Sequence, residues 1–92
     1  MTQGGITMVI TQRFETSYRY DNKIYRGVTR IETWDEPFGS RYRAVIETPP
    51  LRGTYGSEAG TIEQALDFLN LAMQAEGADE ISFIASRQEA GQ

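Results

Sequence analysis

The side chains that carry out most enzyme chemistry are scarce in this chain of 92 residues. It contains no histidine and no cysteine, and Lys23 is its only lysine. Acid–base, nucleophilic or metal chemistry would therefore have to rest on carboxylates, hydroxyls, arginines and tyrosines. Ser57 and Ser86 have no histidine to activate them, and Lys23 falls where an exposed turn is expected. These groups give no nucleophilic site.

Two adjacent pairs of acids are the remaining candidates for catalysis or metal binding. Asp35 precedes Glu36, and Asp79 precedes Glu80. Both pairs fall where a turn or a helix end is expected, and acids there are usually solvated. We therefore predict that the chain is not an enzyme and that it binds no cofactor and no metal.

The elements that position the other side chains begin with strands, because the first half of the chain alternates. From Met8 to Tyr20 the even positions are mostly apolar or aromatic and the odd ones polar, which predicts one long half-buried strand. Ile24–Trp34 and Arg41–Thr48 are two further β-rich runs, each preceded by turn-forming residues. Gly27 is expected to mark a bulge, and Pro49 with its following proline ends the third strand.

One helix is expected after a flexible, glycine-rich connection at 53–60. Thr61 and Gln64 fit a capping box at the start of the helix, and Gly77 is its natural end. Ile81–Ala85 is a short apolar run that predicts a fourth strand. The expected apolar stripe of the helix, widened by its last two members, comprises Ile62, Ala65, Leu66, Leu69, Ala72, Met73, Phe68 and Leu71.

These elements predict an α+β fold: an antiparallel three-stranded meander packed against one C-terminal helix, with a short fourth strand, in the order βββαβ. We expect a single domain over residues 1–92, with flexible ends at 1–5 and 87–92. The core would join the helix stripe to the even face of the first strand. With no long apolar run and no basic start typical of a secretory signal, a cytoplasmic location and no membrane contact are expected.

The net charge of −4 is unevenly distributed along the chain. Residues 12–52 hold eight basic and six acidic side chains, whereas residues 53–92 hold one basic side chain and seven acidic ones. Two faces of opposite potential can result. The acidic candidates for partner binding are Glu58, Glu63, Asp67 and Glu76, which could also form an ordinary solvated face.

Arginines and aromatic residues of the strands are the second set of candidates. These residue types dominate binding hot spots because they combine large contact area with a polar tip. An alternative is that Arg30 or Arg43 pairs across strands with Glu32 or Glu47, which stabilises a sheet without any partner. The candidates are Arg26, Arg30, Trp34, Arg41, Tyr42 and Arg43.

Three short segments, Tyr25–Arg30, Arg41–Ala44 and Thr61 with Glu63 and Ala65, resemble the AP2-type DNA-binding domain. In that family a helix backs a three-stranded sheet whose arginines and tryptophans enter the major groove. Net acidity works against this function, since neutralisation of phosphates normally drives DNA affinity. The resemblance would assign DNA contacts to Arg26, Arg30, Trp34, Arg41 and Arg43.

The C-terminal third is similar to part of a small phage inhibitor of bacterial defence, one of the anti-CRISPR proteins directed at multisubunit type I effectors. The segments that carry this resemblance are Gly56–Gly60, Ala72–Gln74, Gly77 and Ile81–Ser86. It implies a protein partner, a CRISPR effector complex in the host cytoplasm, and no catalytic residues. The acidic helix would meet a basic groove, or the sheet would meet another subunit.

From the sequence we therefore expect a non-catalytic, protein-binding inhibitor of phage or mobile-element origin. The first alternative is a nucleic-acid-binding module with an AP2-like sheet. The second is an antitoxin-like or other regulatory homodimer that pairs through its last strand or its long first strand.

Overall fold

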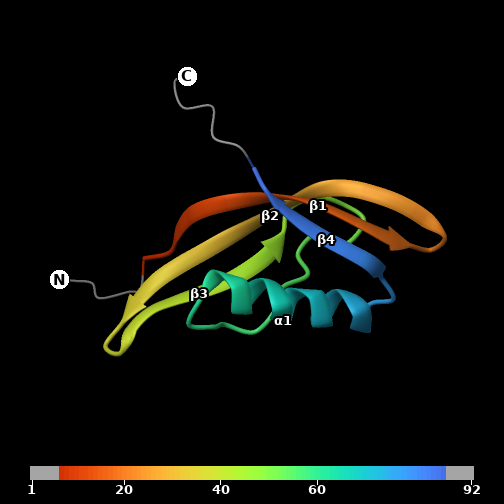
Figure 1. Cartoon of the computed structure of the whole chain (residues 1–92). Coiled ribbons are helices and arrows are strands. Elements are labelled where there is room, and N and C mark those ends of the chain that lie inside the picture. The colour runs from red at the N-terminus through yellow and green to blue at the C-terminus, as the bar shows by residue number, and fades with distance from the viewer. Residues whose placement is uncertain (1–6, 87–92) are drawn as a thin grey trace, which may run out of the picture.

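The computed structural model describes residues 7–86, so the predicted flexible ends at 1–5 and 87–92 lie outside the described residues. The predicted α+β arrangement of three strands, one helix and a last strand is confirmed (Figure 1). Within residues 7–86, the helix is not of the length and apolar character that crossing a membrane requires. The elements are β1 (Val9–Tyr20), β2 (Lys23–Glu36), β3 (Gly39–Ile46), α1 (Ile62–Ala75) and β4 (Asp79–Ala85).

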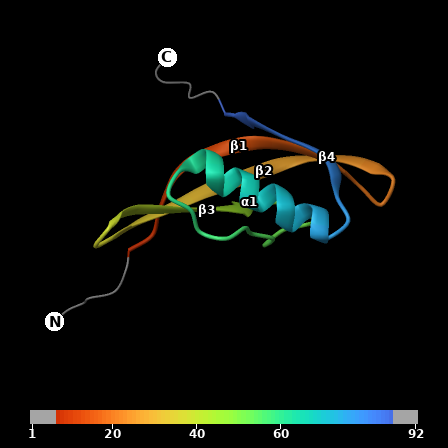
Figure 2. The ribbon, with the colours of Figure 1, turned by 60° about the horizontal axis from the view of Figure 1, so that its bottom comes forward.

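The four strands form one antiparallel sheet in the order β3-β2-β1-β4, so β4 adds to the far side of the first hairpin. Helix α1 lies across one face of this sheet (Figure 2). We call this the helix face and the opposite one the outer face. The core lies between the helix and the sheet and comprises Phe14, Tyr18, Ile31, Ala44, Ile46, Leu51, Ala59, Ala65, Leu69, Met73 and Ala78.

The first hairpin turns at Asp21 and Asn22, where the sequence predicts a turn. Both residues have positive φ values, 55° and 64°. A two-residue turn of this kind matches the twist of the flanking strands, and Asp and Asn tolerate the left-handed conformation better than most residues. The local sequence therefore sets the register of the two longest strands.

The bulge predicted at Gly27 is wrong, since Gly27 pairs in regular register with Thr16. A Cβ atom at Gly27 would overlap the Thr48 hydroxyl, whose Oγ1 accepts a hydrogen bond from the Val28 N–H at 3.2 Å. Glycine is favoured here because another side chain approaches the backbone closely, which is a second reason for glycine inside strands.

The register shift in the β1–β2 ladder lies between Ile10 and Gln12 instead. Because side chains alternate between faces, one extra residue moves every position before it to the opposite face. Ile10 consequently lies opposite Glu32 on the outer face and is 45% exposed, and Met8 is 50% exposed. The expectation that the whole even face of the first strand is core holds for Phe14 and the even positions after it but is wrong for Met8 and Ile10.

Helix α1 begins at the predicted N-cap, Thr61, but the reciprocal bond of the capping box goes to Gly60 instead of Thr61. The Gln64 N–H donates to Thr61 Oγ1 at 3.1 Å, and Gln64 Oε1 reaches back to accept from the Gly60 N–H at 3.3 Å. Gly77 follows the helix with a φ of 103°, as a C-terminal cap requires. Leu71, however, is 61% exposed, so its predicted place in the apolar stripe is wrong.

The glycine-rich connection is ordered along the outer edge of β3. The Ile46 N–H donates to Thr54 O at 2.9 Å and the Gly56 N–H to Ala44 O at 3.2 Å. At Gly56 this segment meets the helix so closely that a Cβ atom would collide with the Leu69 backbone. One edge of the sheet is therefore covered, whereas β4 ends the sheet uncovered on the other side within residues 7–86.

Candidate functional site

Arg30, Arg41 and Arg43 lie on the part of the outer face next to β3, and nearby carboxylates pair with them. Glu32 lies opposite Arg43 in the β2–β3 ladder. Its Oε1 accepts from Arg43 Nη2 at 2.8 Å, and its Oε2 accepts from Arg30 Nε at 2.9 Å. Burial by itself raises the pKa of the Glu32 carboxyl, but the hydrogen bonds and charges of both arginines outweigh it and lower the pKa.

Glu47 extends this ion-pair network across the sheet. Its carboxylate accepts from Arg13 Nε at 3.2 Å and lies 4.0 Å from Arg30 Nη1. Pairing of Arg30 and Arg43 with Glu32 and Glu47, one of the two interpretations of these arginines, is thus what the structure shows. The positive charge of this surface is largely balanced by its own neighbours.

Trp34 is also engaged within the molecule, with only 6% of its surface exposed. Its Nε1–H donates to Glu36 Oε2 at 2.9 Å. The Arg43 guanidinium lies over its ring, 5.7 Å from the centroid, and over the Tyr55 ring at 5.2 Å. Such cation–π contacts stabilise the arginine in place. Trp34 and Arg43 therefore stabilise the sheet and leave little surface for a partner.

Two further candidates are separated from the rest by the fold. Glu58 does not extend the surface of the helix, because it accepts a hydrogen bond from Arg41 Nε at 3.2 Å. Tyr42 lies on the helix face, where its ring packs against the core and its backbone exchanges two hydrogen bonds with Ala59. Tyr42 therefore shares no surface with the neighbouring arginines.

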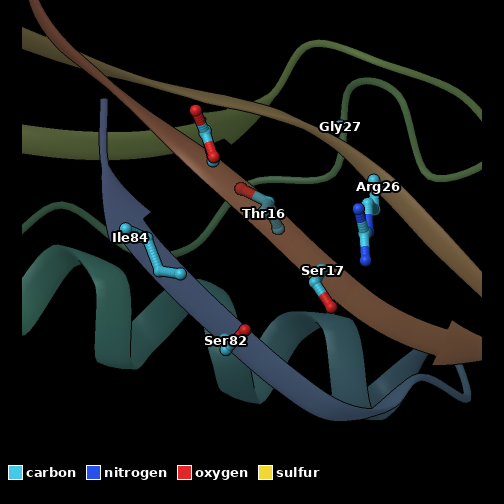
Figure 3. A pocket seen from close by; sticks show the side chains of 7 residues that line it. Thr16, Ser17, Arg26, Gly27, Ser82 and Ile84 are labelled. Carbon is cyan, nitrogen blue, oxygen red and sulfur yellow. The ribbon is translucent and has the colours of Figure 1, made fainter. Parts of the chain in front are cut away.

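Arg26 differs from the other arginine candidates. It is exposed and forms no ion pair with any residue between 7 and 86. It borders an open hollow of about 610 Å³ on the outer face, over β1, β2 and β4 (Figure 3). The side chains of Ser17 and Ser82, which pair across β1 and β4, are too small to fill it. The lining residues are Glu15, Thr16, Ser17, Arg26, Gly27, Ser82 and Ile84.

The remaining acidic candidates lie on or after the exposed side of α1. Glu63 and Asp67 are exposed and four residues apart, which places them on neighbouring turns of one helix face. Leu71 continues the same line, and we call these three residues the acidic helix face. No lysine or arginine occurs between Gly53 and Ser86 to neutralise them in sequence.

Glu76 is exposed at the C-terminal cap of α1, beyond the acidic helix face. An acid at this end of a helix opposes the macrodipole, so it does not stabilise the helix. With Arg52 it borders a second open hollow, of about 570 Å³, between the helix end and the loop after β3.

The adjacent acids considered for catalysis are engaged by partners within the molecule, and Asp79 and Glu80 share Arg19. Asp35 accepts a hydrogen bond from Ser40 Oγ at 3.0 Å, and Glu36 accepts one from Trp34 Nε1. Asp79 receives two hydrogen bonds from Arg19, at 3.0 and 2.8 Å, which lower the pKa of Asp79 and raise that of Arg19. Among residues 7–86, no group of three acids is placed to hold a metal ion.

Tyr18 is the one buried side chain in the described region whose polar atom has no hydrogen-bond partner. Burial raises the pKa of its hydroxyl, although the nearby Leu51 backbone acts in the opposite direction. Its ring lies 5.8 Å from Tyr25, which lies 6.4 Å from Tyr20. The hydroxyl is enclosed by the core, so this cluster packs the hairpin end.

Sequence reasoning missed the first of two features of this surface and gave the second only as one of two alternative edges. The exposure of Leu71 follows from its position four residues after Asp67, a signal that the apolar count of the helix concealed. The open edge of β4 depends on strand order, for which the sequence carries no local signal.

Neither a family model nor a curated protein nor a solved structure matches this chain.

Proposed function

We propose that this chain is a non-catalytic inhibitor that binds a bacterial effector complex directly, in the manner of the anti-CRISPR proteins, through its acidic helix face. The partner surface would be a basic groove that normally receives nucleic acid. The protein would be of phage or mobile-element origin and would act in the host cytoplasm.

The observation that carries this proposal is which charged side chains form ion pairs within the molecule and which do not. Arg13, Arg30, Arg41 and Arg43 each pair with a carboxylate of the sheet or its covering segment. Glu63 and Asp67 form no ion pair within residues 7–86 and project into solvent. Unpaired charge is what a partner of opposite sign can use, both to steer association and to set specificity.

Leu71 supports a protein partner over a purely solvated face. An exposed leucine with acids on the preceding turns has the pattern of a helix that inserts an apolar anchor into a groove with a charged rim. The same pairing of the arginines weighs against DNA binding, because phosphate contacts would have to compete with Glu32 and Glu47.

The test is capture of purified type I CRISPR effector complexes by the tagged chain, with and without nuclease. We expect nuclease-resistant capture by the wild type. Capture should fall about tenfold or more when Glu63→Lys and Asp67→Lys are combined, and also fall with Leu71→Ala.

The matched control reverses two acids elsewhere, Glu15→Lys with Asp35→Lys, which changes the net charge equally. Equal losses for both double variants would show a general charge effect and contradict the proposed face. Capture that disappears on nuclease treatment would favour the nucleic-acid-binding alternative. In that case Arg26→Ala, Arg30→Ala and Arg43→Ala together should abolish salt-sensitive retention on DNA.

A further inference from the structure

The uncovered edge of β4 presents backbone groups at three alternate residues. The Ser86 N–H donates to Arg13 O at 3.1 Å, in line with the β1–β4 register. Hydrogen-bonded positions alternate along an antiparallel strand, so the backbone groups of Ser82 and Ile84 also point toward β1. Those of Ile81, Phe83 and Ala85 consequently point away from the sheet.

This edge lacks the features by which strands usually avoid pairing. Charged side chains, prolines and bulges protect most sheet edges. In β4 the charges stop at Asp79 and Glu80, and the register shift against β1 lies at that same end. The run Ile81–Ala85 is uncharged and regular, whereas the opposite edge, at β3, is covered by the segment 53–60.

Apolar burial is also incomplete along β4. Ile84 is 63% exposed on the outer face. Ile81 and Phe83 lie on the helix face but are only partly buried, because α1 packs more closely against β3 than against β4. Apolar surface on both faces of an edge strand indicates that the sheet can continue beyond it.

We propose that β4 pairs antiparallel with β4 of a second copy of this chain, across a two-fold axis at Phe83. The two four-stranded sheets would join into one continuous sheet. Ile81, Phe83 and Ala85 of each copy would form about six backbone hydrogen bonds in all.

A second copy fits this edge because antiparallel pairing about Phe83 brings the outward backbone groups of one β4 opposite those of the other. In this register Ile81 lies opposite Ala85 of the other copy, and Ser82 lies opposite Ile84. Glu80 lies opposite a serine hydroxyl, Ser86, and no two like charges face each other, although the chain carries a net charge of −4.

The first measurement is the mass of the chain in solution across a dilution series, by light scattering or sedimentation. We expect a concentration-dependent dimer. Ala85→Pro removes an outward N–H without touching the β1 ladder, and Ile84→Lys places a charge on the exposed apolar position. Each should weaken dimerisation about tenfold or more, with Trp34 fluorescence reporting an intact fold. A monomer at every concentration overturns the proposal.

The register can be tested because the chain contains no cysteine. Ser82→Cys and Ile84→Cys lie opposite each other only in this register, so a mixture of the two variants should form an oxidised cross-link that each variant alone forms poorly. Cross-linking of Ser82→Cys with itself would overturn the register. Neither experiment involves the acidic helix face, so its outcome is independent of effector capture.

Discussion

Along the outer face of the sheet, the part next to β3 and the part next to β4 use their polar groups differently. Beside β3, Glu32 and Glu47 bind arginines and Trp34 is covered, which we call the paired half. Beside β4, small residues leave a hollow bordered by Arg26 and Ile84, which we call the open half. The edge next to the paired half is covered, and the edge next to the open half is not.

The difference arises from the stagger of the outer strands along the long β1–β2 hairpin. β3 pairs with the half of β2 that starts at Thr29, whereas β4 pairs with β1 from Phe14 to Arg19. Each outer strand therefore completes a different stretch of the hairpin. Arginine and tryptophan, the residue types that suggest binding, complete the structure in the paired half. In the open half Ser17 and Ser82 are too small to fill the hollow.

The largest effect is expected from opening the covered edge of the paired half. In Gly56→Ala the new Cβ would collide with the backbone of Phe68 and Leu69, so the segment 53–60 and the helix could not both keep their places. We expect a loss of about 3 kcal/mol of unfolding free energy, measured by denaturant titration with Trp34 fluorescence.

The matched control is Gly60→Ala in the same segment. A Cβ there would meet only the Arg41 guanidinium, at an ordinary distance of 3.7 Å. Gly60→Ala should therefore cost far less than Gly56→Ala. Equal effects would mean that the segment does not pack on the helix as described.

The next effect tests the ion pairs of the paired half. Glu32→Gln should cost about 2 kcal/mol at neutral pH, because Glu32 is 8% exposed and accepts charged hydrogen bonds from Arg30 and Arg43. The folded state lowers the pKa of Glu32 below its ordinary 4.5. Its contribution is therefore full above pH 4.5 and is lost as the pH falls below that value.

The variant and the wild type should consequently converge in stability under acid, a comparison to be made by denaturant titration over a pH series. A difference that stays constant down to strongly acidic pH would show that the charge of Glu32 does not contribute.

A smaller effect is expected behind the open half, on the helix face of β2. Gly27→Ala would push against the Thr48 hydroxyl, which is the end of a side chain that can rotate away. We expect a loss of about 1 kcal/mol. Thr48→Ala should remove most of this extra cost, and a double-mutant cycle by thermal or denaturant unfolding measures the coupling. Additive effects would contradict the close approach.

The smallest effect is expected at the exposed end of β4. Arg19 also lowers the pKa of Asp79. The contribution of Asp79 to the free energy of unfolding is therefore lost as the pH falls, like that of Glu32. The side chains of Arg19 and Asp79 are well exposed, however, and solvent and salt screen such ion pairs. Asp79→Asn should change the unfolding midpoint only slightly, and high salt should abolish the difference. A loss as large as that of Glu32→Gln would remove the contrast between the halves.

Local sequence determined the elements and much of the charge distribution. Alternation gave the long strands, Asp21 and Asn22 their turn, and Thr61 with Gln64 the helix start, because each depends on residues within a few positions. The absence of cations between Gly53 and Ser86 likewise follows from the sequence alone.

Tertiary structure decided which faces and edges remain available. The bulge before Gln12 moved Met8 to the outer face, and pairing across strands bound the arginines to Glu32 and Glu47. The order of strands left β4 at an uncovered edge. These outcomes depend on contacts between residues far apart in the chain, whose register and competition for partners no local pattern encodes.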